Sequence, residues 1–431
     1  MAMLDIKLIR ENPEMVKTNL AKRGNPECLR MLEDLIGTDR EWRVNLTKLN
    51  ELRHERKQVT IEIAKLKKTG KEADSQVHQA QDIDVKITDV EKMVTQQEQK
   101  THSFLMQLPN LLDDTVPLGK DSNDNVEVKK WGAIPTFSFP VKNHIDLALA
   151  LDQIDMERAG KVSGSRFFYL KDQVARLDMA LMSFGIEELT QKGYIPIVPP
   201  YLLNREAYEG VTSLGDFADV LYKIENEDLY LIATSEHPMA AMYMNEVLKE
   251  QDMPVKLAGL STCFRKEAGA HGKDTRGIFR THQFNKIEQF IFCKPEDSSK
   301  LQEELLQNAE EILQKLELPY HVVNVCTGDI GTVAAKKYDI EAWMPAQNGY
   351  REVVSCSNCT DYQGRRLGIR YREKEGAAVK GCVHTLNSTA IATGRTIVAL
   401  IENNQMADGS INIPKVLRKY MSNREKIERK P

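Results

Sequence analysis

The sequence predicts an α+β protein: an N-terminal antiparallel pair of long helices, followed by a larger body that contains an antiparallel sheet. Two observations support this division. From Trp42 to Leu108 apolar residues recur at alternating spacings of three and four, and proline and aromatic residues are almost absent. From Trp131 onward glycine, proline and β-branched apolar runs return, and residues 257–290 have the pattern of two strands joined by a loop.

Composition is that of an ordinary globular protein. The chain has 431 residues, of which 41% are hydrophobic and 28% charged, and one to three domains are expected. The formal net charge is only -4, so a polyanionic partner would require a local excess of positive charge. No apolar run is long enough to span a membrane, and the first ten residues do not resemble a signal peptide. Seven cysteines do not suggest a disulfide framework, so we expect a cytoplasmic protein.

The helical region follows a short preamble, residues 1–38, that contains Asn12-Pro13. The first helix has coiled-coil positions at Trp42, Asn45, Leu49, Leu52, Arg56, Val59, Ile63 and Leu66. Thr69-Gly70-Lys71 interrupts it, and a second helix has such positions at Ile83, Ile87, Val90, Val94, Gln97, Thr101, Phe104 and Leu108. Pro109 ends the second helix. The pattern predicts an antiparallel arm over about 40–108, with helices of about 27 residues and roughly 40 Å.

The charges of this arm leave two interpretations. A coiled coil of this kind commonly serves as a dimerisation element or a spacer. However, the first helix is rich in Lys and Arg, whereas the second carries Asp82, Asp84, Asp89 and Glu91. This asymmetry favours a polyanion such as RNA as partner. The candidate RNA contacts are Arg43, Arg53, Arg56, Lys57 and Lys65.

The body lacks the two commonest nucleotide-binding loops, the P-loop and the dinucleotide-binding glycine fingerprint. Instead, residues 257–267 and 278–290 form a predicted strand hairpin in which alternate side chains share a face. Arg265 and Glu267 share one parity on the first strand. On the return strand the residues of one parity are Arg280, His282, Phe284, Glu288 and Phe290. Neither a solvated face nor a core face suits this mixture, whereas a ligand-binding face does, because arginines grip phosphates and a ring stacks on a base.

A single CxxC, Cys356-Ser-Asn-Cys359, could form half of a zinc site with Cys382 or His384. Because no second matching pair occurs, we interpret these as buried structural cysteines.

Three segments resemble the motifs of class II aminoacyl-tRNA synthetases. Motif 1 corresponds to about 175–200 and ends in GYIPIVPP, motif 2 to about 257–290 with F-R-x-E and R-x-H-Q-F, and motif 3 to about 389–405 with TAIATGR. Thr234-Ser-Glu236, EVVSCSNCTD from Glu352, HTLNST from His384 and the helical arm are similar to the seryl-tRNA synthetases, in an archaeal-like variant. The resemblance implies an antiparallel catalytic sheet flanked by helices over 111–431 and a tRNA-binding domain over 1–110.

The resemblance also implies a role for individual residues. Arg265 would bridge the serine carboxylate and the ATP α-phosphate, and it is expected to be catalytic together with Glu288 and Arg395. ATP would further contact Glu267 through its adenine amino group, Phe284 by stacking opposite Arg395, and Arg280 through its phosphates. Glu352 and Ser355 would hold Mg2+. The expected serine-binding residues are Thr234, Glu236, Arg265, Glu288, Asn387 and Thr389.

The implied reaction is ATP-dependent formation of seryl-adenylate and pyrophosphate, followed by transfer of serine to tRNA(Ser), and by resemblance also to tRNA(Sec). A homodimer through residues 175–200 is expected, and no separate editing domain. Two residues depart from the family pattern, Asn404 and Ser388, and for Asn404 we expect a local packing change.

Two other functions remain open. A paralogue that loads a small amino acid onto a carrier protein would lack the arm. A non-enzymatic paralogue would have lost Arg265, Glu267, Glu288 or Arg395, all of which are present.

Overall fold

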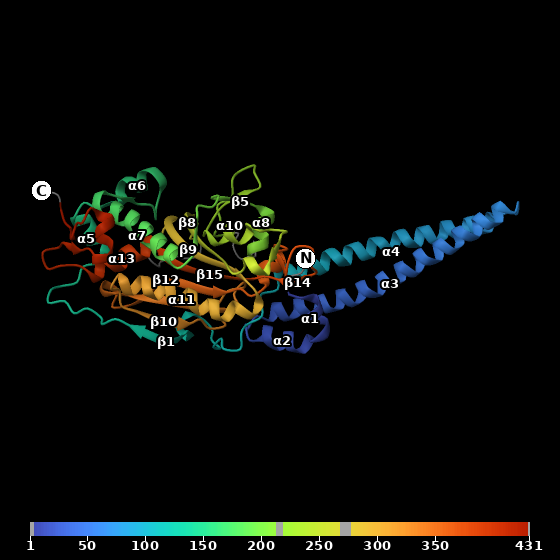
Figure 1. Cartoon of the computed structure of the whole chain (residues 1–431), viewed down its shortest axis with the longest axis horizontal. Helices are drawn as coiled ribbons and strands as arrows, with labels where there is room; N and C mark the ends of the chain where they lie inside the picture. The colour runs from blue at the N-terminus through green and yellow to red at the C-terminus, as the bar shows by residue number, and fades with distance from the viewer. Residues whose placement is uncertain (1–3, 213–218, 268–276, 430–431) are drawn as a thin grey trace. The chain divides into compact units, whose positions relative to one another are not determined.

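The fold is known from a computed structural model that describes residues 4–212, 219–267 and 277–429. Its internal contacts divide the chain into two compact units, Met1–Leu111 and Leu112–Pro431, which are described separately (Figure 1). The middle of predicted motif 2, residues 268–276, lies outside the described residues.

The first unit is helical. Its helices are α1 (Ile6–Glu11), α2 (Pro13–Ala21), α3 (Pro26–Lys68) and α4 (Asp74–Gln107). Figure 1 shows α3 and α4 running side by side in opposite directions, as the coiled-coil pattern predicts. However, α3 has 43 residues and α4 has 34, so the prediction of about 27 residues each was too short, and the described part of the predicted preamble, residues 4–38, is largely helical. The cause is local, because Asn25 caps the backbone N–H of Glu27 and Pro26 occupies the first helical position.

Two kinds of packing hold this unit together. At its base, α1 and α2 enclose a small core with α3 and α4, which includes Val16, Leu20, Leu35, Leu105 and Leu108. Farther along, the two long helices bury only a narrow stripe, in which Leu49 packs near Val90 and Val94, and Val59 near Ile83. Asn45 Nδ2 also donates a hydrogen bond of 3.1 Å across the stripe to Gln97 Oε1. The outer part of the arm is therefore a two-helix structure that contributes nothing to the core at the base.

The second unit is built on an eight-stranded sheet, which confirms the predicted α+β class. Every neighbouring pair is antiparallel except β4 and β8, which are parallel. In spatial order the strands are β1 (Val126–Trp131), β10 (Tyr320–Asn324), β11 (Lys336–Met344), β12 (Gly349–Asn358), β15 (His384–Ala392), β9 (Gln283–Cys293), β8 (Val255–Phe264) and β4 (Ile195–Ile197). The predicted strand hairpin corresponds to β8 and β9, which pair from Val255 opposite Phe292 to Phe264 opposite Gln283.

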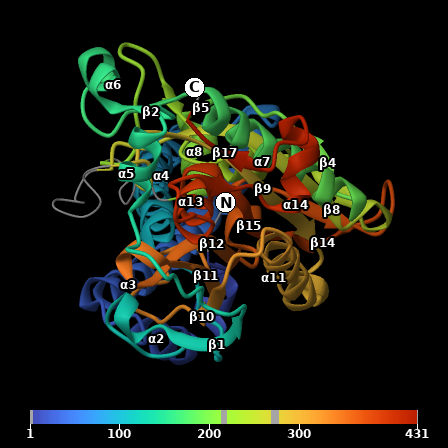
Figure 2. The same ribbon diagram turned by 90° about the vertical axis from the view of Figure 1, so that its left-hand side faces the viewer.

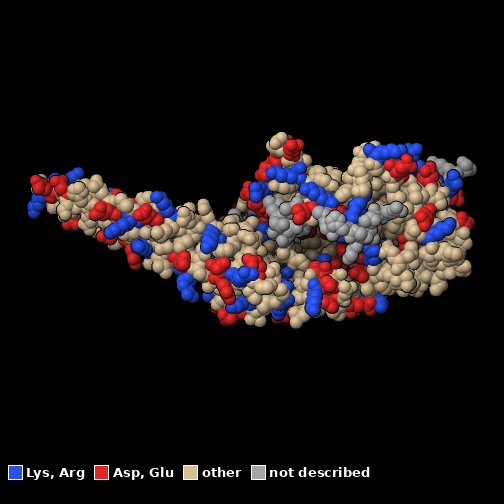
Figure 3. All heavy atoms as spheres, turned by 180° about the vertical axis from the view of Figure 1, so that it is seen from behind, with Lys and Arg blue, Asp and Glu red and all other residues tan. Residues whose placement is uncertain are grey.

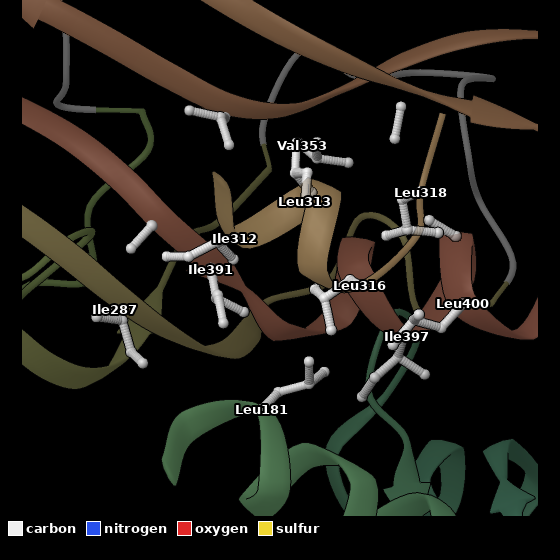
Figure 4. Packing of buried hydrophobic residues seen from close by; sticks show 14 of the residues in the cluster. Leu181, Ile287, Ile312, Leu313, Leu316, Leu318, Val353, Ile391, Ile397 and Leu400 are labelled. Carbon is white, nitrogen blue, oxygen red and sulfur yellow. The ribbon is translucent and has the colours of Figure 1, made fainter. Parts of the chain in front are cut away.

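One face of the sheet is covered by three helices, α7 (Asp172–Gln191), α11 (Ser298–Lys315) and α13 (Thr393–Asn403). Figure 2 shows them gathered around β9, β12 and β15. The main hydrophobic core lies between these layers, where Leu181, Ile312 and Ile397 from the helices meet Ile287 and Ile391 from the sheet (Figure 4). Because side chains alternate along a strand, the residues between these apolar positions point to the opposite face.

That opposite face is apolar only in part. A second core places Phe290 and Phe292 of β9 against α8 (Arg205–Val211) and α10 (Glu236–Ala241). The rest of the unit consists of short elements: α5 (His144–Ala150), β2 (Ile154–Asp155), α6 (Met156–Ser163), β3 (Tyr169–Leu170), β5 (Leu202–Asn204), β6 (Leu229–Leu231), β7 (Val247–Lys249), α12 (Tyr362–Arg366), β13 (Arg370–Arg372), β14 (Val379–Cys382), β16 (Ile411–Asn412), α14 (Lys415–Arg418) and β17 (Lys426–Ile427). Among the described residues, no helix is long and apolar enough to cross a membrane.

Candidate active site

A cavity of about 260 Å³ opens on the sheet face opposite α7, α11 and α13. It brings together every residue that the sequence predicted for ATP and serine: Thr234, Glu236, Arg265, Glu267, Arg280, Phe284, Glu288, Glu352, Ser355, Asn387, Thr389 and Arg395. The roles assigned to these residues remain predictions. Asn404 and Ser388, the two departures from the family pattern, do not line this cavity.

The strand register explains why residues so distant in sequence meet. Glu288 of β9 lies opposite Thr389 of β15, and Asn387 of β15 lies opposite Ser357 of β12. Ser355, two residues earlier on β12, therefore points to the same face as Ser357. Three antiparallel strands thus form a continuous polar surface beneath the cavity.

Buried acidic groups mark one end of the cavity. Thr234 precedes α10, and its Oγ1 accepts a 3.1 Å hydrogen bond from the backbone N–H of Glu236. The carboxylate of Glu236 accepts a 3.0 Å hydrogen bond from Gln363 Nε2. Desolvation, with repulsion from Glu288, raises the pKa of Glu236 to about 7. Burial lowers the pKa of the neighbouring His237 to about 3, so that imidazole is neutral and forms a 2.9 Å hydrogen bond with the Tyr208 hydroxyl.

Sequence analysis missed a buried lysine at this end. Lys286 of β9 forms an ion pair with Glu288, and its Nζ donates a 2.6 Å hydrogen bond to Thr234 Oγ1. Lys286 has the same parity as Phe284 and Glu288, so strand alternation could have revealed it. Burying an ammonium group without a partner is costly. A lysine that lies between two candidate ligand residues on the same face of a strand therefore indicates a paired, functional lysine.

Arginines and aromatic rings occupy the other end. The Arg265 guanidinium lies 5.3 Å from the centroid of the Phe284 ring, and its Nε donates a 3.2 Å hydrogen bond to the carbonyl of Ala233. Arg280 and Glu267, predicted to contact the phosphates and the adenine, form an ion pair with each other at 2.8 Å. The side chains that surround a ligand on this surface are thus held by one another.

Arg395 lies beside an aromatic ring that the sequence did not predict for the site. Its guanidinium lies 5.3 Å from the centroid of the Phe279 ring, a residue that was not among the predicted ones. Arg395 also forms a 3.1 Å ion pair with Glu352. Stacking of an adenine between Phe284 and Arg395 remains a prediction.

Glu352 and Ser355 offer hard oxygen ligands. Desolvation opposes ionisation of Glu352, but the positive charges of Arg395, Lys337 and Arg265 hold its pKa below the ordinary value. Glu352 is therefore a carboxylate. Among the described residues, no group of three or more His, Cys, Asp or Glu side chains could hold a metal by itself. A divalent ion here would need most of its ligands from phosphate and water, as Mg2+ commonly does.

The CxxC cysteines are buried free thiols, as we interpreted them. Cys356 faces the main core. Cys359 lines the cavity, where Asn387 Nδ2 lies 3.5 Å from its sulfur, and burial raises the pKa of its thiol well above the ordinary value. Neither thiol is therefore a nucleophile at neutral pH.

The predicted RNA contacts lie on the first unit, and three of the five are engaged within it. Arg53 pairs with Glu91 at 2.8 Å, Arg56 pairs with Asp84 at 2.8 Å, and Arg43 pairs at 3.1 Å with the buried Asp39. Lys57 and Lys65 are exposed, and no ion pair involves them in the described part of the chain. Positive and negative side chains alternate along the visible face of the arm (Figure 3), so its positive charge is less concentrated than the sequence suggested.

A mostly antiparallel sheet with arginines and buried acids on one face agrees with the class II aminoacyl-tRNA synthetase fold that the sequence motifs predicted. Accordingly, the family model "tRNA synthetase class II core domain (G, H, P, S and T)" matches residues 221–404. The model "Seryl-tRNA synthetase N-terminal domain" matches residues 3–112.

Individual relatives agree over the whole chain. The chain is 54% identical over 423 residues to a serine–tRNA ligase of Methanocella arvoryzae, covering 98% of this chain and 100% of that one. The crystal structure of seryl-tRNA synthetase from Pyrococcus horikoshii complexed with ATP has 48% identity and a TM-score of 0.96, with 100% of each chain covered. A cytoplasmic serine-tRNA ligase from Naegleria fowleri in complex with AMP has 35% identity and a TM-score of 0.91, covering 100% of this chain and 99% of that one. The chain belongs to the seryl-tRNA synthetase family.

Proposed function

We propose that this protein activates L-serine with ATP and then transfers the seryl group to tRNA(Ser). The position of Arg265 carries the proposal. Desolvation is the largest influence on the pKa of both Glu288 and Glu352, and the positive charge of Arg265 lowers the pKa of each. One guanidinium is thus close enough to Glu288 and to Glu352 to act on both carboxylates, which belong to opposite ends of the cavity. This is where a group that bridges an amino acid and a nucleotide is needed.

The first step joins the two substrates. A carboxylate oxygen of serine attacks the α-phosphorus of ATP, the bond to the bridging oxygen breaks, and pyrophosphate leaves. Arg265 holds the carboxylate and the α-phosphate together and offsets the charge that develops between them. Arg395 and Arg280 would hold the departing phosphates, and Phe284 and Glu267 would receive the adenine. No side chain has to act as a covalent nucleophile.

Glu352 and Ser355 fit a Mg2+ ion bound to the phosphates, because an ionised carboxylate and a hydroxyl are hard ligands. Such an ion supplies additional neutralisation of phosphate charge. Both side chains lie on β12, and Glu352 is already held by Arg395. Recognition of the phosphates and placement of the ion therefore involve the same residues.

The acidic end is suited to a small hydroxylated amino acid. Glu288 and Glu236 offer carboxylate oxygens to an ammonium group, with Thr234 beside them, and Thr389 and Asn387 lie next to Glu288 to bind a side-chain hydroxyl. Alanine would leave these polar groups unpaired, so it is rejected. In the second step the terminal ribose hydroxyl of tRNA attacks the acyl carbon and AMP leaves.

The first unit, residues 1–110 in the predicted division, is the proposed tRNA-binding domain. Lys57 and Lys65 are its best-placed phosphate contacts because they are exposed and have no ion-pair partner among the described residues. Arg53 and Arg56 would have to exchange an acidic partner for a phosphate, which reduces their net contribution. By family resemblance, tRNA(Sec) is a second acceptor. Seven free cysteines support the proposed cytoplasmic location.

We also propose a homodimer through predicted motif 1. The support is a set of exposed apolar side chains on α7 and around the edge strand β4: Met179 is 68% exposed, Ile195 55% and Val198 70%. Exposed apolar residues at a sheet edge favour association. Sedimentation equilibrium should give twice the chain mass of 49.0 kDa, and Val198→Glu should shift the protein toward monomer. A monomer with full activity would contradict this proposal.

The catalytic proposal is tested by exchange of radiolabelled pyrophosphate into ATP. Exchange should depend on serine and be at least about 100-fold slower with alanine at equal concentration, since alanine leaves the hydroxyl-binding groups unpaired. It should also be slower with threonine, whose extra methyl group the site has to exclude by its bulk. Purified tRNA(Ser) should then accept serine. Exchange without charging of tRNA would favour a carrier-protein ligase, and no exchange with any amino acid would favour a non-enzymatic paralogue.

A further inference from the structure

One charged group in the cavity has no part in the mechanism above. Lys286 is only 6% exposed, and its Nζ lies between two groups expected at the amino end of serine. It pairs with the Glu288 carboxylate and donates to Thr234 Oγ1 at 2.6 Å. The backbone N–H of Glu236 donates to the same oxygen at 3.1 Å.

These two donors change the expected role of Thr234. A hydroxyl oxygen has two acceptor lone pairs, and both are used by protein donors in this arrangement. The remaining acceptors for a substrate ammonium group are then the carboxylates of Glu288 and Glu236. Because a neutral carboxylic acid binds an ammonium ion far more weakly than a carboxylate does, the ionisation of Glu288 becomes decisive.

The surroundings of Glu288 work against ionisation. It is only 2% exposed, and desolvation raises its pKa above the ordinary value. The charges that lower it are Lys286 on the same strand and Arg265 after β8, while Thr389 of β15 contributes a hydrogen bond. Glu236 on α10 repels the carboxylate, and the thiols of Cys263 and Cys356 also lie nearby. Lys286 is the only cation that pairs directly with Glu288 among the described residues.

We propose that Lys286 is a positioning residue that keeps Glu288 ionised and aimed at the ammonium group of the amino-acid substrate. This rests on the proposed serine activation and adds a determinant of amino-acid binding to it. The lysine acts through Glu288 and does not touch the reacting atoms. An uncompensated carboxylate at this depth would take up a proton instead.

The test is Lys286→Met, which keeps most of the side-chain volume and removes the charge. Loss of a positive charge moves the pKa of Glu288 and that of its neighbour Glu236 upward, so the rising limb of kcat/KM for serine against pH moves to higher pH. At a pH below the parental pKa of Glu288, a rise of one unit in that pKa raises the KM for serine in pyrophosphate exchange about tenfold. The increase should shrink as the pH is raised to 8.5, and the KM for ATP should stay within about threefold of the parental value, since Lys286 lies at the amino-acid end.

Three further variants separate positioning from structural damage. Lys286→Arg should restore the parental pH profile, because it restores the charge. Lys256→Met removes a lysine of β8 whose ion pair with Glu304, at 2.7 Å, is remote from the cavity lining, and it should keep the parental KM and pH profile. Lys286→Gln keeps a donor for Thr234, and it carries the same test if Lys286→Met melts below the assay temperature.

The outcomes are distinct. A parental KM and pH profile in Lys286→Met and Lys286→Gln would overturn the inference, as would a lower KM for serine, which would mean that Lys286 competes with the substrate ammonium. Equal losses at every pH, with no rescue by arginine, would also overturn it, because the role would be structural. Failure of the parental enzyme to exchange pyrophosphate with serine would instead refute the proposed function.

Discussion

Arg265→Ala is expected to reduce serine-dependent pyrophosphate exchange by a factor of about 100 or more while the fold stays intact. The guanidinium is a cation that acts on both Glu288 and Glu352, and in the proposed reaction negative charge accumulates beside it as the serine carboxylate attacks phosphorus. Removal of one preorganised donor from such a position costs about 3 kcal/mol or more in the transition state. In the folded protein the substitution removes a 3.2 Å hydrogen bond to Ala233, a contact with the Phe284 ring and part of the positive charge that opposes protonation of Glu288 and Glu352.

The matched control is Arg205→Ala. Arg205 forms an exposed ion pair with Glu209 on α8 at 2.7 Å, and such pairs contribute about 0–1 kcal/mol to stability. Both variants should melt within a few degrees of the parent, and only Arg265→Ala should lose exchange. Arg265→Lys keeps the positive charge but loses the two parallel N–H donors of the guanidinium, so its rate of pyrophosphate exchange should lie between those of the two alanine variants. Exchange at nearly the parental rate in Arg265→Ala would show that motif 2 has been assigned to the wrong segment.

Shortening the arm is expected to separate the two steps of the reaction. The arm was predicted over about 40–108, but a deletion of Trp42–Leu108 would take Leu105 and Leu108 out of the core at the base of the first unit. The structure offers a better junction. Asn45 and Gln97 are hydrogen-bonded across the arm, so residues 46–96 can be replaced by a short glycine-rich turn.

This variant should exchange pyrophosphate at the parental rate, because no residue of the arm lines the cavity. Charging of tRNA(Ser) should fall by about 100-fold or more in kcat/KM, and its dependence on salt should become weaker, since phosphate contacts by lysines and arginines are lost. Both activities are measured on one preparation, so exchange is the internal control. Unchanged apparent affinity for tRNA would mean that the arm is a spacer. Loss of exchange in a folded variant would instead indicate coupling between the arm and the cavity.

The sequence by itself determined the features that follow from local periodicity. The spacing of three and four predicted the antiparallel helices, although it missed that α3 begins at Pro26, because residues 26–41 pack on α1 and α2 instead of extending the coiled coil. Alternation predicted the β8–β9 hairpin and the polar face that carries Phe284 and Glu288. Both predictions depend only on residues that are close in sequence, within two turns of a helix or two positions of a strand, so they can be made from the sequence alone.

The tertiary structure alone decided which side chains become partners. Glu288 meets Thr389 and Lys286 meets Thr234 because the register of distant strands and the docking of α10 bring them together, and register is set by the packing of the whole core. Tertiary packing also brings Arg395 over the Phe279 ring. It likewise brings Glu91 and Asp84 of the facing helix into ion pairs with Arg53 and Arg56. The spacing of residues along the sequence predicts which face of a helix or strand a residue lies on. The charged side chain that it contacts there comes from another segment of the chain. The ionisation of the cavity, and with it the chemistry, is therefore a property of the folded structure.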